Sequence, residues 1–159
     1  MTDMLVKLYN LPPLEPALAR AAAAGVEIRR ALAAEKPIVV GWVAHHFEPY
    51  WAGECDVAFS RAPVACFIAV EKGQPVGFAC HDATARNFFG PTGVLESQRG
   101  RGLGQGLLLA CLHAMREQGF AYAIIGGVGP VDFYEKVVGA TVIPDSTPGI
   151  YKNMLEIRS

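Results

Sequence analysis

The stretch ESQRGRGLGQGLLLACL, residues 96–112, decides the fold, because a glycine-rich loop turns there into an apolar run. Leu103, Leu107 and Leu108 recur with the spacing of one helical face, so we predict a helix over 103–119. Glycine is the poorest helix former apart from proline, yet four glycines stand at the start of this helix. Those glycines therefore need a reason other than helix formation.

Glycines at a helix start leave the backbone N–H groups accessible. The first N–H groups of a helix have no partner within it and carry partial positive charge, so a polyphosphate can bind them. Gly100, Gly102 and Gly104 remove the side chains, and Arg99 and Arg101 add cationic donors. We therefore predict a pyrophosphate-binding loop. The alternative is that the glycines only form a tight turn between a strand and a helix.

Two other nucleotide-binding loops fit this stretch less well. A P-loop continues with Gly-Lys-Ser/Thr, whereas this loop continues with Gly-Gln-Gly. A Rossmann dinucleotide site needs an acidic residue at the end of the next strand, and the predicted strand over 122–127 has none. Both nucleotide interpretations are weakened.

The order of predicted elements indicates one mixed α/β domain. The chain has 159 residues, of which 52% are hydrophobic, enough for a core. Apolar patterns and turn residues predict strands over 5–11, 26–32, 65–70, 75–80, 87–96, 122–127, 140–144 and 150–157. They predict helices over 14–25, 35–47, 51–60, 103–119 and 129–140. Residues 14–32 also fit one long helix, but a glycine inside it at Gly25 would cost about 1 kcal/mol.

Charge and apolar runs limit the partners. The net charge of −1 gives no electrostatic case for a nucleic-acid or membrane partner. No apolar run approaches the roughly 20 residues that span a bilayer, and the N-terminus lacks a signal-peptide pattern. We expect a cytoplasmic protein. The four cysteines lack metal-site spacing, so we expect buried reduced thiols and no metal.

The segment Arg99-x-x-Gly102-x-Gly104 matches the acetyl-CoA signature of the GNAT superfamily of N-acetyltransferases. Residues 26–47 resemble the first strand and helix of that family, and residues 91–112 resemble its fourth strand, pyrophosphate loop and third helix. DFYEKVVGA, residues 132–140, is similar to the Phe-Tyr-Glu-Lys helix near its C-terminus. The resemblance implies a GNAT domain over 26–159. An extension over 1–25, read as a strand plus a helix, precedes this domain and is expected to pack on it. The extension is also a candidate homodimer contact.

The resemblance also implies a central mixed sheet flanked by helices, whose fourth and fifth strands splay apart to hold acetyl-CoA as cosubstrate, with no metal. The acetyl group would pass directly to a primary amine of a small molecule or peptide in a ternary complex. The alternatives are a non-catalytic acyl-CoA-binding or sensing domain and a Rossmann-like nucleotide binder. The cofactor-binding residues implied are Gly93, Val94, Arg99, Gly100, Arg101, Gly102, Leu103, Gly104 and Phe133.

The same resemblance places Tyr134 at the general-acid position, although a core aromatic is the alternative. Glu96 is the first candidate for the base, and a solvated turn carboxylate is its alternative. The implied acceptor-site residues are His46, Tyr50 and Trp51, with His46 as the second candidate base. Gly127 departs from the family pattern, because members often carry there an asparagine that contacts the cofactor. A ping-pong route through Cys80 or Cys111 is disfavoured, because no activating base accompanies either cysteine.

Overall fold

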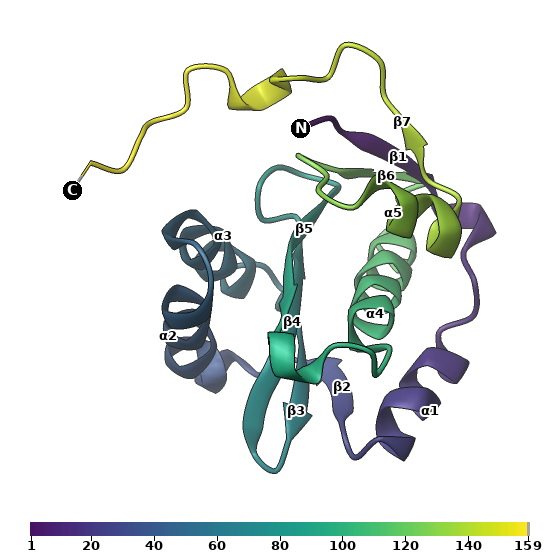
Figure 1. The fold of residues 1–159 in the computed structure, drawn as a ribbon, viewed down its shortest axis with the longest axis vertical. Coiled ribbons are helices and arrows are strands. Elements are labelled where there is room, and N and C mark those ends of the chain that lie inside the picture. Colours follow the sequence, from purple (N-terminus) through teal and green to yellow (C-terminus); the bar gives the residue numbers. More distant parts are fainter. Residues whose placement is uncertain (159) are drawn as a thin grey trace.

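Seven strands form one mixed sheet in the computed structural model, which describes residues 1–158 (Figure 1). In chain order they are β1 (Met4–Lys7), β2 (Glu27–Arg30), β3 (Cys66–Glu71), β4 (Gln74–His81), β5 (Phe88–Val94), β6 (Tyr122–Ile125) and β7 (Thr141–Val142). Across the sheet the order is β2-β3-β4-β5-β6-β1-β7, and β5 and β6 form the parallel pair of this sheet. Ser159, the last residue of the expected domain, lies outside the described residues.

Helices cover both faces of the sheet (Figure 1). Two of them pack on one face and three on the other. The first group is α2 (Lys36–His46) and α3 (Pro49–Phe59), and the second is α1 (Glu15–Ala23), α4 (Leu103–Glu117) and α5 (Val131–Val138). The expected α/β fold, a mixed sheet flanked by helices, is confirmed. The break at Gly25 is confirmed as well, because Gly25 has φ +82° and β2 follows it as a strand.

The core beneath α4 follows the predicted pattern. Leu103, Leu107, Leu108, Leu112 and Met115 are all buried against the sheet. Burying one such side chain contributes about 1.5–3 kcal/mol, so this face holds the loop at the start of α4 firmly on the sheet.

The splay of two central strands is also confirmed. Phe88 and Phe89 of β5 pair with Ile124 and Ile125 of β6, and β6 then ends. β5 continues to Val94, so the edge of β5 beyond Phe89 has no β6 partner. The two strands therefore open a gap in the middle of the sheet.

The N-terminal strand lies inside the sheet. β1 pairs antiparallel with β6 on one side and with β7 on the other. The strand is shorter than predicted, because a 3-10 turn replaces it over Leu8–Asn10. Met4 and Val6 of β1 are fully buried. The N-terminal residues thus contribute to both the sheet and the core.

The C-terminal strands differ from the prediction. Only Thr141–Val142 of the expected strand over 140–144 pairs with the sheet, and the expected strand over 150–157 is wrong. Asn153 has φ +60°, a left-handed conformation that interrupts an extended run. The segment instead crosses toward α3, where the Tyr50 hydroxyl donates to the Leu155 carbonyl at 2.8 Å (Figure 1).

Candidate active site

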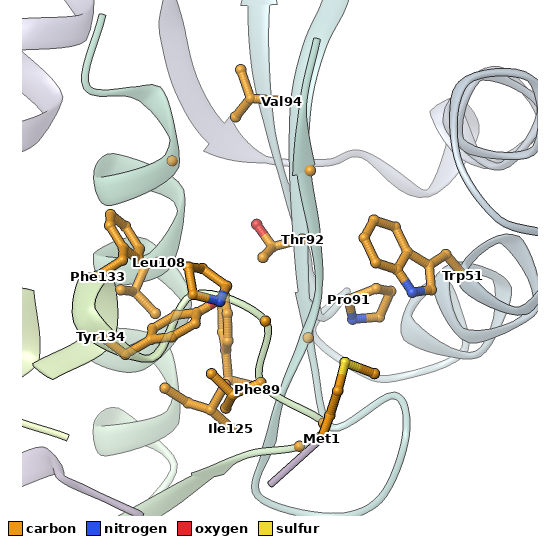
Figure 2. Close-up of a pocket in the computed structure, with 18 of the residues that line it drawn as sticks. Met1, Trp51, Phe89, Pro91, Thr92, Val94, Leu108, Ile125, Phe133 and Tyr134 are labelled. Atoms are coloured by element: carbon orange, nitrogen blue, oxygen red, sulfur yellow. The ribbon is translucent and has the colours of Figure 1, made fainter. Parts of the chain in front are cut away.

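A cavity of about 970 Å³ lies where β5 and β6 separate. Its walls come from β5, the start of α4, α5, the loop after β6, α3 and the C-terminal segment. Figure 2 shows Phe133 and Tyr134 on one side of β5 and Trp51 on the other. The cavity therefore has an α4 side and an α3 side, which meet at β5.

The α4 side holds most of the residues expected to bind the cofactor. Gly100 and Gly102 have φ +85° and +76°, the left-handed conformation that favours glycine, and Gly102 caps the start of α4. The first turn of α4 has N–H groups without partners inside the helix, and Gly102 and Gly104 add no side chains of their own beside them. The expected residues that line this part of the cavity are Gly93, Val94, Arg99, Gly100, Gly102, Leu103, Gly104 and Phe133.

Arg101 is not among the lining residues. Its guanidinium group pairs with Glu71 at 2.9 Å and also donates to Gln98 and to the Ala24 carbonyl. These contacts tie the loop to the hairpin between β3 and β4 and to the end of α1. Arg101 therefore positions the loop.

Arg20 is a cation beside this loop that the sequence did not indicate. A Cβ on Gly102 would lie 2.8 Å from the Cζ, Nε and Nη1 atoms of Arg20. Arg20 comes from α1, far from the loop in sequence, so no motif connects the two. The guanidinium group adds positive charge next to the first turn of α4.

Tyr134 lines the cavity and belongs to the core as well. Its side chain is 6% exposed, and its ring packs edge-on against Phe133 and Phe89, with centroids 5.1 Å and 6.3 Å away. Burial raises the pKa of Tyr134 to about 12. The hydroxyl therefore stays protonated at neutral pH and can donate a proton into the cavity.

Glu96 and His46 lie outside the lining of the cavity. Glu96 is exposed at the first position of the 3-10 turn Glu96–Gln98. His46 is exposed at the end of α2, with its ring 5.4 Å from the ring of Trp42. The other two residues expected at the acceptor site, Tyr50 and Trp51, do line the cavity.

Glu54 is an acidic residue of the α3 side that sequence reasoning missed. It lies half-buried in the cavity wall and accepts a hydrogen bond from the Thr84 hydroxyl. Burial raises the pKa of Glu54, although the bond from Thr84 opposes this effect. Trp51 and Glu54 are three positions apart on α3 and share a face, so this spacing could have identified Glu54.

Tyr151 closes the same side of the cavity from the C-terminal segment. Burial, with a smaller contribution from the negative charge of Glu54, raises the pKa of Tyr151. The α3 side thus combines one carboxyl group with aromatic rings. This set can hold a small cation.

Gly127, where the family pattern often has asparagine, offers no free backbone donor. Its N–H donates to the Asp3 carboxylate at 2.8 Å. Asp3 is itself buried and immediately precedes β1. The Gly127 N–H therefore contacts the N-terminal segment, where the family pattern has a residue that contacts the cofactor.

Comparison with known proteins gives a family match by sequence. The sequence model of the Acetyltransferase (GNAT) family matches residues 26–140. A search of the curated proteins finds no match. Within residues 1–158, no helix combines the length and the apolar character that crossing a membrane requires.

Solved structures show the same fold at low sequence identity. A glucosamine N-acetyltransferase region of a fungal multi-domain GH3 β-N-acetylglucosaminidase is 16% identical with a TM-score of 0.72, over 89% of this chain and 19% of that one. A GCN5-related N-acetyltransferase from Sphaerobacter thermophilus is 21% identical with a TM-score of 0.63, over 89% and 48%. A GNAT acetyltransferase from Brucella melitensis, in complex with acetyl-CoA, is 19% identical with a TM-score of 0.55, over 74% and 86%. The chain thus spans less than half the length of the first two.

Proposed function

The chain belongs to the GNAT acetyltransferase family, and from this premise we propose that it transfers an acetyl group from acetyl-CoA to a primary amine of a small molecule or peptide. One observation carries the proposal. A single cavity joins a loop suited to a diphosphate with a half-buried carboxyl group among aromatic rings. Both substrates of a direct transfer can therefore meet at β5, and holding them together supplies much of the rate.

The residues on the α4 side fit coenzyme A. A Cβ at Gly100 or Gly104 would meet no heavy atom within 4 Å, so the space beside this backbone is open to a ligand. The N–H groups over residues 99–104 would hold the pyrophosphate. The edge of β5 at Gly93 and Val94, which β6 leaves unpaired, would hold the pantetheine arm through backbone hydrogen bonds.

Two proton transfers are assigned to residues of the cavity. Tyr134, protonated at neutral pH, would donate to the departing thiolate. Glu54 would take the proton that the arriving ammonium group must lose, and its raised pKa brings the carboxylate closer to that task. Glu96, the first candidate base from the sequence, is exposed and outside the lining, so Glu54 is the better candidate.

The acceptor is proposed from the chemistry of the α3 side. Glu48 and Glu54 line it together with Tyr50, Trp51 and Tyr151. Carboxylates and aromatic faces both attract a cation. A primary amine that is protonated in solution and carries a compact apolar body fits this wall.

The second candidate function is binding of an acyl-CoA without turnover. The hydrogen bond from Gly127 to Asp3 favours it, because a contact point of the family is occupied by the chain itself. The two functions differ in the fate of the bound cofactor. A sensing domain binds acetyl-CoA and releases no thiol with any amine.

The test is calorimetry of the full chain with acetyl-CoA, followed by an amine library read by release of free thiol. We expect binding, and thiol release with a subset of cationic amines. Tyr134→Phe should lower kcat on that subset about 10²–10⁴-fold, the range of general acid catalysis, while acetyl-CoA still binds. Binding with no turnover across the library would favour the sensing domain, and affinity for NAD without affinity for acetyl-CoA would overturn both.

A further inference from the structure

Three of the four cysteines meet in the layer between α3 and the sheet. Cys55 lies on α3, and Cys66 and Cys80 are directly opposite each other on β3 and β4. Their Sγ atoms all lie within 4.8 Å of one another, and none of the three residues has exposed surface. None of them lines the cavity. Spacing along the sequence could not show this cluster, because each cysteine comes from a different element.

The surroundings of this cluster, which we call the three-thiol cluster, are apolar. The cysteines belong to one hydrophobic core cluster whose other buried members are alanine, valine, isoleucine and phenylalanine. Within residues 1–158, no histidine, carboxylate or further cysteine joins the three sulfur atoms as a fourth donor. Zinc in structural sites takes four ligands, and full burial keeps water from filling the fourth position. The cluster therefore favours an ion that is satisfied by three sulfur ligands.

Charge selects among such ions. Three thiolates carry three negative charges, so a monovalent ion leaves a complex of −2 and a divalent ion a complex of −1. An unpaired charge in an apolar interior is strongly disfavoured. A trivalent ion gives a neutral complex, which the interior accepts without a counterion.

We propose that Cys55, Cys66 and Cys80 form a binding site for one trivalent, sulfur-seeking metalloid or metal ion. With arsenite as the probe, As(OH)₃ and three thiols give one As(S–Cys)₃ group and three molecules of water. Three As–O bonds break and three As–S bonds form, and each thiol proton leaves in a water molecule. Arsenic stays trivalent throughout, so the step needs no oxidant or reductant.

The distances suit this complex. Bonds of about 2.3 Å between sulfur and the bound ion, as in zinc thiolate sites, place three sulfur ligands about 3.5–4.0 Å apart. The three sulfur atoms already lie within 4.8 Å of one another. Binding would tie α3 to β3 and β4, and because the cluster is buried, the ion enters when α3 opens locally.

The experiment uses the full, reduced chain titrated with arsenite without oxygen. We expect native mass spectrometry to show one arsenic per chain, with binding slower than mixing. Arsenic K-edge spectroscopy should count three sulfur neighbours and no oxygen. Cys111→Ser is the matched control, because Cys111 is equally buried but lies on α4, outside the cluster. Cys111→Ser should bind as the unchanged chain does, whereas Cys66→Ser should bind at least about tenfold more weakly.

The spectroscopy on the unchanged chain tests the three-sulfur site even if Cys66→Ser does not fold. Two sulfur neighbours with one oxygen, no arsenic bound, or equal loss in Cys111→Ser would each overturn the proposal. Retention of zinc in preference to arsenite would overturn the trivalent assignment. Because the cluster lies outside the cavity, none of these results bears on the acetyl transfer.

Discussion

At Gly104, a substitution should change ligand affinity and folding stability in opposite directions. Gly104 is the second residue of α4, it lines the cavity, and a Cβ there meets no heavy atom within 4 Å. We expect Gly104→Ala to raise the free energy of unfolding, by up to about 1 kcal/mol, because alanine is the better helix former. The same methyl group would stand where a diphosphate approaches the backbone, so affinity for acetyl-CoA should fall at least about tenfold.

Thermal unfolding and calorimetry measure the two effects of Gly104→Ala. Gly41→Ala is the control, because Gly41 is also helical, exposed and free of contacts within 4 Å, but lies on α2 away from the cavity. It should gain stability and keep its affinity. Full affinity in Gly104→Ala would mean that the diphosphate does not bind at this turn.

The raised pKa of Glu54 predicts how the reaction rate depends on pH. Burial raises its pKa above the ordinary value of 4.5, and a base must be ionised to act. The rate should therefore rise with pH along an acidic limb that lies above 4.5. Glu54→Gln should lower kcat by about 10²–10⁴-fold and remove this limb. If Glu96→Gln removes the limb instead, Glu96 is the base.

The raised pKa of Glu54 also affects stability, with a definite sign. The folded chain holds this proton more tightly than the unfolded chain, so the folded state loses relative stability as the pH rises through this range. Glu54→Gln cannot ionise and should remove that loss. Urea unfolding at several pH values tests this, with Glu117→Gln on the exposed end of α4 as the control.

The residues of the site divide by how the sequence presents them. The loop glycines stand together in one motif, so they could be predicted. Glu54 lines the cavity and shares a helical face with Trp51, a spacing that could have identified it. Arg20 lies on α1, and only the fold brings it beside Gly102. Arg101 belongs to the motif, but its guanidinium group pairs with Glu71, thirty positions away. Arg101 therefore positions the loop and does not line the cavity.

At the level of elements, α1 contributes the cation Arg20 to the loop at the start of α4. The matched part of the family sequence model includes this loop but not α1. Arg20 is exposed and precedes the matched residues 26–140. We expect Arg20→Gln to weaken acetyl-CoA binding by about threefold to tenfold, or ~0.7–1.4 kcal/mol. The loss should shrink as salt is added, because added salt screens the attraction that the arginine supplies.

Calorimetry at low and high salt tests the role of Arg20. Arg116→Gln is the control, because Arg116 is exposed at the opposite end of α4. It should bind acetyl-CoA as the unchanged chain does. An equal loss in both variants would point to general electrostatic attraction and would remove the specific role of α1.

Most elements could be predicted, because hydrophobic period and turn residues are local signals. The exception over 150–157 has a physical reason. The segment contains several apolar residues, but a strand needs a partner, and β1 already occupies the position beside β6. The left-handed Asn153 then lets the segment turn toward Tyr50 on α3. Pairing between distant segments is information that a local pattern does not carry.

For the whole molecule, we propose that the extension over 1–25 and the domain over 26–159 fold as one unit. Besides the strand pairs of β1, the N-terminal segment forms several bonds to distant loops. The Val128 N–H donates to the Thr2 carbonyl at 2.8 Å, and the Ile143 N–H donates to the Asp3 carbonyl at 2.9 Å. Removing this segment would expose the edges of both β6 and β7.

A single substitution in β1 tests whether the two segments fold as one unit, without shortening the chain. Val6 is fully buried between the sheet and its helices, whereas the next residue, Lys7, is exposed on the same strand. Val6→Asp places an unpaired charge in the shared core, so we expect the whole chain to lose about 3–5 kcal/mol of unfolding free energy in urea. Lys7→Asp, which changes charge at an exposed position, should change the unfolding free energy by about 0.5 kcal/mol or less.

Both variants should unfold in one transition, because the strands on either side of the gap share one core. Two separate transitions in Val6→Asp, with the loop at α4 still binding acetyl-CoA after the first, would show that the family domain folds without β1.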